Sequence, residues 1–101
     1  MYGTITTVAA PIAMYDHMHA ELGRRVGPTI EGLLVHIGRA TGDGFEVLEI
    51  WESQDQCERA NREIVLPVMR ELAGDQADAV EQQMTTFEVR GLVLPSASVY
   101  V

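Results

Sequence analysis

Side chains that can move a proton occur on two neighbouring apolar runs of this chain. An imidazole, His36, interrupts the first run, and a carboxylate, Glu49, interrupts the second. If the two runs form an antiparallel hairpin closed by a loop of two or four residues, His36 lies directly opposite Glu49. A carboxylate next to an imidazole fixes its tautomer, and an imidazole titrates near neutral pH. The pair therefore predicts a general base, oriented by its carboxylate, that takes a proton from a phenol or an activated carbon.

Four further side chains are suited to binding a substrate beside that pair. They are Tyr15, His19, Trp51 and Asn61. Tyr15 and Asn61 can hydrogen-bond an oxygen that gains negative charge, and the ring of Trp51 can lie against a flat ligand. We predict that these four residues bind substrate and line one cavity together with the catalytic residues His36 and Glu49.

A structural interpretation of the same residues stays open. A cross-strand His and Glu can satisfy each other without any reaction, and Trp51 can simply fill the core. Backbone groups can likewise satisfy Asn61 and His19. The sequence also leaves open whether His36 and Glu49 lie on the sheet face that the helices cover. On the opposite face, the pair would belong to a subunit interface rather than to a cavity.

The hairpin that carries the pair has the clearest local pattern in the chain. The runs GLLVHIGRA (32–40) and FEVLEIWE (45–52) are rich in residues typical of strands. The loop Thr41-Gly42-Asp43-Gly44 joins them, and Gly and Asp tolerate the positive φ of a tight turn. The predicted face of the pair also carries Leu34, Gly38, Val47 and Trp51, and the other face carries Val35, Ile37, Leu48 and Ile50. Gly38 leaves a gap beside the pair.

Two helical patterns flank the hairpin. The run YGTITTVA (2–9) predicts a strand, and residues 12–26 then carry an apolar arc at helical spacing that ends at Gly27-Pro28. Ser53-Gln54-Asp55-Gln56 is a capping box, which predicts a second helix with an apolar arc over residues 57–72. We expect Pro67 to bend that helix, and Ala73-Gly74-Asp75 to end it.

The C-terminal part is expected to return to the sheet. A helical turn at 77–83 precedes a last strand at 84–95, MTTFEVRGLVLP. The tail SASVYV is too short to form a unit alone, and it can pair along an exposed sheet edge.

The order β-α-β-β-α-β predicts an α+β fold of the ferredoxin-like type. Right-handed crossovers place both helices on one face of a four-stranded antiparallel sheet. At 101 residues we expect a single domain, 1–101, with a thin core. The other face would alternate between apolar and polar residues if water covered it, but the strand runs put apolar side chains on both faces. We therefore expect a homodimer in which a second copy covers that face.

Composition and charge argue against several classes of partner and cofactor. Seven basic and fifteen acidic residues give a net charge of −8, the wrong sign for nucleic acid or an anionic membrane surface. No apolar run is long enough to span a bilayer, and the N-terminus lacks the basic region of a signal peptide. The histidines lack the spacing of a helical metal site, and no Gly-rich phosphate loop occurs. We expect a cytoplasmic protein without metal or other cofactor, whose one cysteine, Cys57, is unreactive.

A longer run supports a family resemblance. In EVLEIWESQDQCERANREIVLPVMREL (46–72), a strand ends in Trp-x-Ser and a Pro-bearing helix follows. With GLLVHIG after the first helix and the same order of elements, the chain resembles the dimeric α/β barrel superfamily, specifically its antibiotic biosynthesis monooxygenase-like group. The resemblance implies a homodimer whose two sheets close into a barrel, with a ligand cavity between sheet and helices in each subunit.

The resemblance also carries expectations about activity. Haem-degrading relatives have a second Trp on the helix and a His further along it, where this chain has Ala60 and Arg70, so haem degradation is not expected. Cofactor-free oxygenases use an Asn, a Trp and a Tyr to bind a phenolic substrate, and Asn61, Trp51 and Tyr15 are candidates of the same types. The expected function is a cofactor-independent monooxygenase acting on a hydroxylated aromatic or polyketide-type metabolite. The alternative is a non-catalytic small-molecule binder or a structural homodimer.

Overall fold

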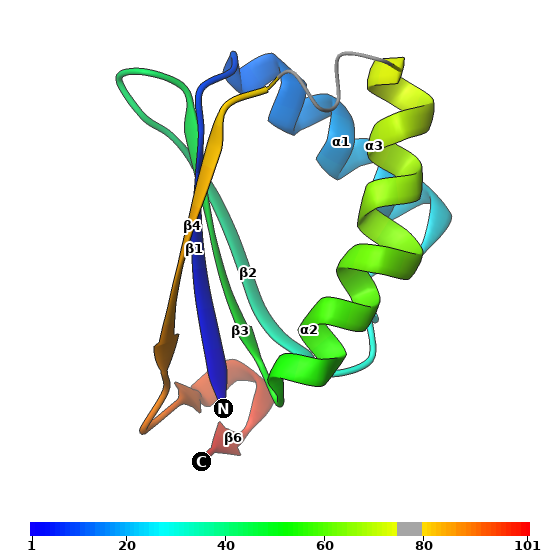
Figure 1. The fold of residues 1–101 in the computed structure, drawn as a ribbon. Coiled ribbons are helices and arrows are strands. Elements are labelled where there is room, and N and C mark those ends of the chain that lie inside the picture. Colours follow the sequence, from blue (N-terminus) through cyan, green and yellow to red (C-terminus); the bar gives the residue numbers. More distant parts are fainter. Residues whose placement is uncertain (75–79) are drawn as a thin grey trace.

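A four-stranded antiparallel sheet forms one layer of the computed structural model, which describes residues 1–74 and 80–101 (Figure 1). Its strands are β1 (Tyr2–Val8), β2 (Leu33–Ala40), β3 (Phe45–Trp51) and β4 (Gln82–Glu88), in the spatial order β2-β3-β1-β4. Each crossover helix joins two strands that have a third strand between them. The predicted α+β, ferredoxin-like order is confirmed.

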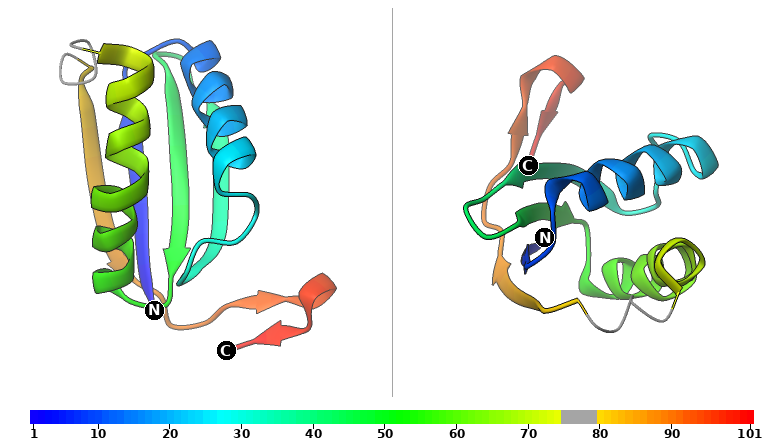
Figure 2. Two further views of the ribbon diagram at one scale, coloured as in Figure 1. Left: turned by 90° about the vertical axis from the view of Figure 1, so that its right-hand side faces the viewer. Right: turned by 90° about the horizontal axis from the view of Figure 1, so that it is seen from above.

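Two helical segments form the second layer, on one face of the sheet (Figure 2). The first is α1 (Ile12–Arg25), and the second runs without a break from α2 (Gln54–Ala60) to α3 (Leu66–Ala73). The views show α1 over β2 and β3, and the second segment over β1 and β4. No helix in residues 1–74 or 80–101 is both long and apolar enough to cross a membrane.

The β2–β3 hairpin has the predicted register at the polar pair. Its loop has four residues, and His36 lies opposite Glu49. Near the end of β3 the register differs from the prediction, because a β-bulge makes Leu33 rather than Leu34 the partner of Trp51. A bulge adds one unpaired residue to its strand, so the faces of the pair are kept while the start of β2 bends.

The second helical segment contains a widened turn where the sequence predicts a bend. The Oγ of Ser53 accepts a hydrogen bond from the backbone N–H of Gln56 at 3.2 Å, and α2 begins directly after this cap. Residues Asn61–Val65 form a π-helical turn, η1, immediately before α3. Pro67 follows, and a proline ring clashes with the carbonyl four residues earlier in a regular α-helix. The wider turn accommodates that ring, so the helix continues to Ala73 instead of breaking.

The predicted end of this helix is confirmed where it is described. Gly74 has a φ of 58° and a ψ of −134°, a backbone conformation that favours glycine and cannot continue the helix. Asp75 lies outside the described residues, and so do residues 77–79 of the predicted helical turn.

The last strand begins and ends earlier than predicted. It spans Gln82–Glu88 rather than 84–95. The helical turn expected at 77–83 is therefore wrong at residues 80–83, of which 82 and 83 belong to the strand and 80 and 81 are not helical. The reason is the neighbouring strand: β4 pairs with β1 along its whole length, from Val8 opposite Gln82 to Tyr2 opposite Glu88. Beyond Glu88 the partner strand has ended, and the ladder stops with it.

The C-terminal tail pairs with the segment just before it in the chain rather than with the edge of the sheet. β5 (Val93–Leu94) and β6 (Val99–Tyr100) form a separate two-stranded ribbon around a 3-10 turn, η3 (Pro95–Ala97). This ribbon lies beyond the end of the four-stranded sheet in Figures 1 and 2.

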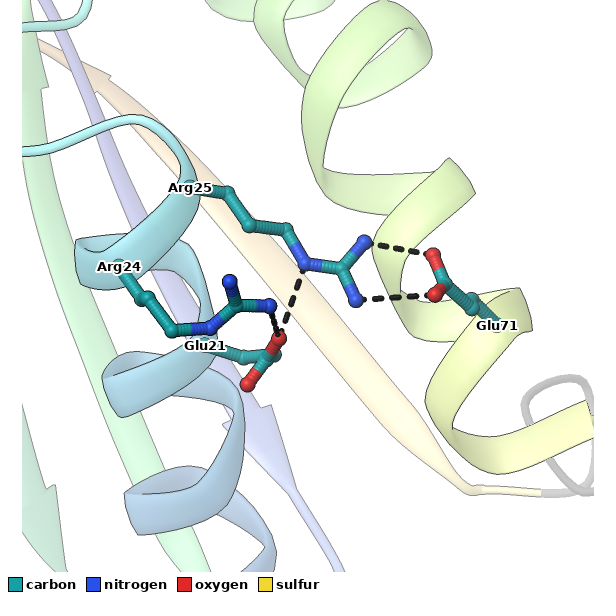
Figure 3. Close-up of polar contacts among 4 residues, drawn as sticks. All are labelled: Glu21, Arg24, Arg25 and Glu71. Carbon is teal, nitrogen blue, oxygen red and sulfur yellow. Dashed lines mark hydrogen bonds and ion pairs between the residues drawn. The ribbon is translucent and has the colours of Figure 1, made fainter.

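The helical layer packs closely on the sheet at one end, and near the other end an ion pair joins the two helical segments to each other. Trp51, Cys57 and Ala60 form a buried cluster where β3 leads into α2. Near the end of α1, the guanidinium of Arg25 forms two hydrogen bonds to the carboxylate of Glu71 on α3, at 2.5 and 2.9 Å (Figure 3). No residue of α1 is itself buried. The middle of the interlayer space is therefore not filled by core side chains.

Candidate functional site

His36 and Glu49 lie on the sheet face that the helices cover. Both line a cavity between the two layers, and the hydroxyl of Tyr15 on α1 contacts His36 directly. Phe45 and Val47 share the face of β3 that carries Glu49, and they line the same cavity. The pair therefore does not lie on the bare face of the sheet.

The pair is part of a continuous chain of hydrogen bonds. Nδ1 of His36 is 2.8 Å from Oε2 of Glu49, and Nε2 of His36 is 2.9 Å from the hydroxyl oxygen of Tyr15. The same hydroxyl is 3.4 Å from Nδ1 of His19, one turn further along α1. The other carboxylate oxygen of Glu49 accepts the indole N–H of Trp51 at 3.3 Å. The side chains of His36 and Glu49 are 28% and 20% exposed, so solvent and small molecules can reach the chain.

Tyr15 occupies the gap that the sequence predicts at Gly38. A Cβ at Gly38 would stand 2.5 Å from Cε2 of Tyr15, and closer still to Cζ and the hydroxyl oxygen. Phe45 supports the ring from the sheet, with centroids 5.6 Å apart. Burial, aided by the carboxylates of Asp16 and Glu49, raises the pKa of Tyr15 above its ordinary value. The hydroxyl therefore stays protonated at neutral pH and can donate a hydrogen bond.

A cavity of about 460 Å³ opens beside this chain of hydrogen bonds. Its walls come from β1, β3, β4, α1, η1 and α3, with His36 from β2. Sites for small organic ligands fall in this range of volume. Five of the six predicted site residues line the cavity: Tyr15, His19, His36, Glu49 and Asn61.

The prediction that all six residues line one cavity is wrong for Trp51. Its side chain is only 2% exposed and packs against Cys57 and Ala60. Trp51 is the last residue of β3, and α2 begins close behind it and covers the ring. Its remaining link to the site is the N–H that it donates to Glu49, which helps to hold the carboxylate in place.

Asn61 enters the cavity from the second helical segment, at the first residue of the π-helical turn. Its side-chain amide lies 3.8 Å from the sulfur of Cys57, one turn earlier. Burial raises the pKa of the Cys57 thiol to about 11, with smaller contributions from Glu49 and Glu58. The sulfur is thus a neutral, weak acceptor. π-helical turns of this kind occur frequently at functional sites.

Methionine side chains form much of the cavity lining, a feature that was not predicted from the sequence. Four of the chain's five methionines line this cavity: Met14, Met18, Met69 and Met84. Their unbranched, polarisable side chains adapt to irregular shapes and make favourable contacts with aromatic rings. Met18 lies on the helical arc that the sequence predicts, so part of the signal was local. Met69 and Met84 come from α3 and β4, and only the fold brings them to the same place.

The arrangement combines an acid–base chain with an adaptable apolar cavity. Ionised Glu49 can only accept a hydrogen bond, so it holds His36 with Nδ1 protonated. An imidazole held in this way can take up a proton that a ligand loses. The neutral hydroxyl of Tyr15 and the amide of Asn61 can both donate to a ligand oxygen that becomes negative. The site is therefore suited to a flat, apolar molecule with an ionisable hydroxyl group.

The sequence matches no family model and no curated protein. The fold, by contrast, matches solved structures over most of their length. An antibiotic biosynthesis monooxygenase candidate from Deinococcus radiodurans is 14% identical, over 93% of this chain and 97% of that chain, with a TM-score of 0.61. SnoaB, a cofactor-independent oxygenase from Streptomyces nogalater, is 19% identical over 93% and 94% of the two chains, with a TM-score of 0.58. MhuD, a haem degrader from Mycobacterium tuberculosis, is 18% identical over 92% and 99%, with a TM-score of 0.56.

TM-scores of 0.56 to 0.61 show a common fold, and identities of only 14% to 19% leave the activity to be argued from the site. The likeness covers 92% to 93% of this chain in these three comparisons. The resemblance that the run at 46–72 suggests is confirmed at this level. The chain shares the ferredoxin-like fold of these solved structures, among them an antibiotic biosynthesis monooxygenase candidate and SnoaB.

Proposed function

We propose that this protein is a cofactor-independent monooxygenase that acts on a hydroxylated aromatic compound with fused rings. The observation that carries this proposal is the hydrogen-bonded set Glu49, His36 and Tyr15 beside a methionine-lined cavity of about 460 Å³. The fold similarity to SnoaB, a cofactor-independent oxygenase, supports it. His36 acts as the base, Glu49 orients it, and Tyr15, His19 and Asn61 contact the substrate.

In the proposed reaction, the substrate first loses a proton from a ring hydroxyl or an activated CH₂ group. The base is the His36–Glu49 pair, and the new anion is stabilised by hydrogen bonds from Tyr15 and Asn61. An electron-rich aromatic anion can reduce O₂ directly, so the step needs neither metal nor flavin. Conversion of CH₂ to C=O by O₂ releases one water molecule, which takes the second oxygen atom and both hydrogens. No external reductant is required.

Oxygen uptake tests this function. Purified protein, dialysed against a chelator, is mixed with a panel of anthrone-like phenols while dissolved O₂ is recorded. We expect uptake with at least one fused-ring member and a strong loss in His36→Gln and Glu49→Gln. His17→Gln is the matched control, because His17 is an exposed histidine that does not line the cavity. Absence of uptake across the panel, or equal uptake by His36→Gln, would refute the oxygenase function.

A homodimer, formed through the bare face of the sheet, accompanies this proposal. That face carries apolar residues on neighbouring strands, among them Ile5, Ile37 and Leu48, which lie in one paired row. Ile37, within the edge strand β2, is 54% exposed, although isoleucine is among the residues most often buried. Each copy is strongly acidic overall, but Arg39 and Glu46 at the end of this face form an ion pair and leave it neutral there. A second copy can therefore cover the row without like-charge repulsion.

The variant Ile37→Lys tests the dimer. We expect wild-type protein to sediment as a dimer and Ile37→Lys as a monomer, because two buried ammonium groups would face each other across the interface. Ile12→Lys is the matched control, since Ile12 is also an exposed isoleucine, 37% accessible, but belongs to α1. An Ile37→Lys variant that remains dimeric would show that the subunits associate elsewhere. We place the protein in the reducing cytoplasm, which suits its single free cysteine, Cys57.

A non-catalytic binder or structural homodimer is the second candidate. One observation favours it: among the described residues, no buried side-chain nitrogen or oxygen lacks a hydrogen-bond partner. Glu49, His36 and Tyr15 also hydrogen-bond one another without a ligand. In that case, removal of His36 and Glu49 would alter stability and leave every ligand-dependent measurement unchanged.

A further inference from the structure

The hydrogen bonds between four side chains have a direction that follows from their chemistry. Ionised Glu49 can only accept a hydrogen bond, so Nδ1 of neutral His36 carries the ring proton. Nε2 of His36 is then bare, that is, unprotonated. An unprotonated Nε2 can only accept a hydrogen bond, so the hydroxyl of Tyr15, 2.9 Å away, donates to it. The oxygen of Tyr15 has then used its only proton, and it accepts from Nδ1–H of His19. In every hydrogen bond of the chain, the donor is therefore the group farther from Glu49 and the acceptor is the group nearer to it.

This direction leaves one basic atom free at the far end. With Nδ1 of His19 protonated, Nε2 of the same ring is bare, and it has no hydrogen-bond partner within residues 1–74 and 80–101. His19 lines the cavity. Both nitrogens of His36, by contrast, are already engaged, one by Glu49 and one by Tyr15. A ligand hydroxyl therefore meets an available imidazole nitrogen on His19, and it meets His36 only if Tyr15 is displaced.

We propose that Nε2 of His19 accepts the proton of the bound hydroxyl, and that Tyr15 relays the charge to His36. The inference rests on the proposed function and assigns His19, rather than His36, as the group that touches the acidic hydrogen. It makes His19 a catalytic residue, and it makes Tyr15 the link between two imidazoles that do not hydrogen-bond each other.

The transfer balances with one proton and no change of oxidation state. The ligand O–H bond breaks and an N–H bond forms at Nε2 of His19. The proton on Nδ1 of His19 moves to the oxygen of Tyr15, whose own proton moves to Nε2 of His36. Tyr15 ends neutral, His19 ends neutral with its tautomer reversed, and His36 becomes an imidazolium beside the Glu49 carboxylate. After the transfer, the ligand is an anion beside His19, and His36 and Glu49 form an ion pair on the sheet.

The surroundings favour this end state. Three rings stack around the transfer path, with the His19 and His36 centroids 5.6 Å apart and their planes within 13°. The raised pKa of Tyr15 disfavours a persistent phenolate, so the tyrosine passes a proton on without holding a charge. The ionisable groups that face the path are Glu49 from β3 and Asp16 from α1. The cavity residues of η1, α3 and β4, such as Asn61 and Met69, carry no charge. The positive charge is therefore best placed at His36, next to Glu49.

The first test needs no ligand. Nitrogen-15 NMR of the three histidines in alkaline buffer reports which ring nitrogen carries the proton. Free imidazole side chains prefer the Nε2–H tautomer, and exposed His17 is the internal control for that form. We expect the Nδ1–H tautomer for both His19 and His36. In Tyr15→Phe, His19 should revert to the form of His17, while His36 should keep its tautomer because Glu49 still holds it. A His19 that matches His17 in the wild type would overturn the proposal.

The second test follows the proton. The probe is 7-hydroxycoumarin, a two-ring phenol whose anion absorbs at longer wavelength than the neutral form, added in slightly acidic buffer. We expect the anion band on binding, with both nitrogens of His36 becoming protonated. In Tyr15→Phe the relay is cut, so the imidazolium should appear on His19 instead. In His19→Gln the anion band should be lost. Retention of the anion band in His19→Gln would overturn the assignment.

The outcomes separate this inference from the oxygenase proposal. The expected tautomers and relay, together with no oxygen uptake from any phenol, would support the chain and refute the oxygenase. Oxygen uptake by a protein whose His19 has the Nε2–H tautomer would support the oxygenase and refute the relay.

Discussion

Replacement of Gly38 by alanine tests whether the hydrogen-bond chain depends on the space beneath Tyr15. The added Cβ would stand 2.5 Å from Cε2 of Tyr15, whereas ordinary contact begins at 3.4 Å, so the ring has to retreat by about 1 Å. The backbone of Gly38 is paired with Val47 in the sheet and resists movement, so the flexible side chain moves instead. The hydroxyl of Tyr15, now 2.9 Å from His36, then leaves hydrogen-bonding range.

The size of the effect follows from three contributions to the free energy of unfolding. Loss of the Tyr15–His36 hydrogen bond costs about 0.5–1.5 kcal/mol. Disturbed contacts of the Tyr15 ring with Phe45 and the two imidazoles cost about 0.5–1.5 kcal/mol more. Alanine in a strand regains about 0.5–1 kcal/mol relative to glycine. We therefore expect Gly38→Ala to be destabilised by about 1 kcal/mol and to remain folded.

A double-mutant cycle isolates the contact. In the background Tyr15→Ala, the ring is absent, so Gly38→Ala should stabilise the protein by about 0.5–1 kcal/mol. The coupling between the two positions is then about 2 kcal/mol. Gly42→Ala is the matched control, because a Cβ at this loop glycine meets nothing within 4 Å. Urea denaturation at one fixed protein concentration measures all variants, and the nitrogen-15 signals of His36 report whether Tyr15 still donates to Nε2.

Two results would refute this reasoning. Equal effects of Gly38→Ala with and without the Tyr15 ring would show that Tyr15 does not occupy the space over Gly38. An unchanged His36 signal in Gly38→Ala would show that the hydrogen bond survives the added methyl group.

Three further predictions concern other groups of the site and the helices. The double replacement His36→Leu with Glu49→Leu should be at least as stable as the wild type, because a partly buried ion pair is often matched by apolar residues of similar volume; a loss of several kcal/mol in urea denaturation would make the pair structural. The guanidinium groups of Arg24 and Arg25 lower the pKa of Glu21 from 4.5 to about 2. This contribution is present above pH 4.5 and is lost as the pH falls toward 2, so the difference in Tm between the wild type and Glu21→Gln should vanish over that range; a constant difference would contradict it. The Cys57 thiol, with its pKa raised to about 11, should resist iodoacetamide at pH 8 in the native protein and react after unfolding in urea; rapid native alkylation, measured by mass, would contradict its burial.

Local elements of this protein were predictable because their determinants lie close together in the sequence. The four-residue turn at 41–44 set the register that puts His36 opposite Glu49, and Ser53 marked the start of α2. The β4 boundaries were not predictable in this way, because they depend on where β1 begins and ends. The π-helical turn before Pro67 was read as a bend, since sequence spacing alone does not distinguish a kink from a widened turn.

The candidate site was also predictable only in part. The residue types indicated its chemistry, and five of the six predicted residues do line one cavity. Trp51 was misplaced because its exposure depends on how closely α2 follows β3. The gap at Gly38 was recognised, but its occupant was not, since Tyr15 reaches it from an element that is distant in the chain.

By itself the sequence determined the order of elements, the hairpin register and the residue types that carry the chemistry, because these follow from short-range patterns of polarity and turn residues. The tertiary structure alone decided which sheet face carries His36 and Glu49, and that Tyr15 and His19 extend the pair into one hydrogen-bond chain. It also decided that four methionines line the space beside it. The physical reason is that these contacts join segments that are distant in sequence, and they exist only once the helices have packed across one face of the sheet.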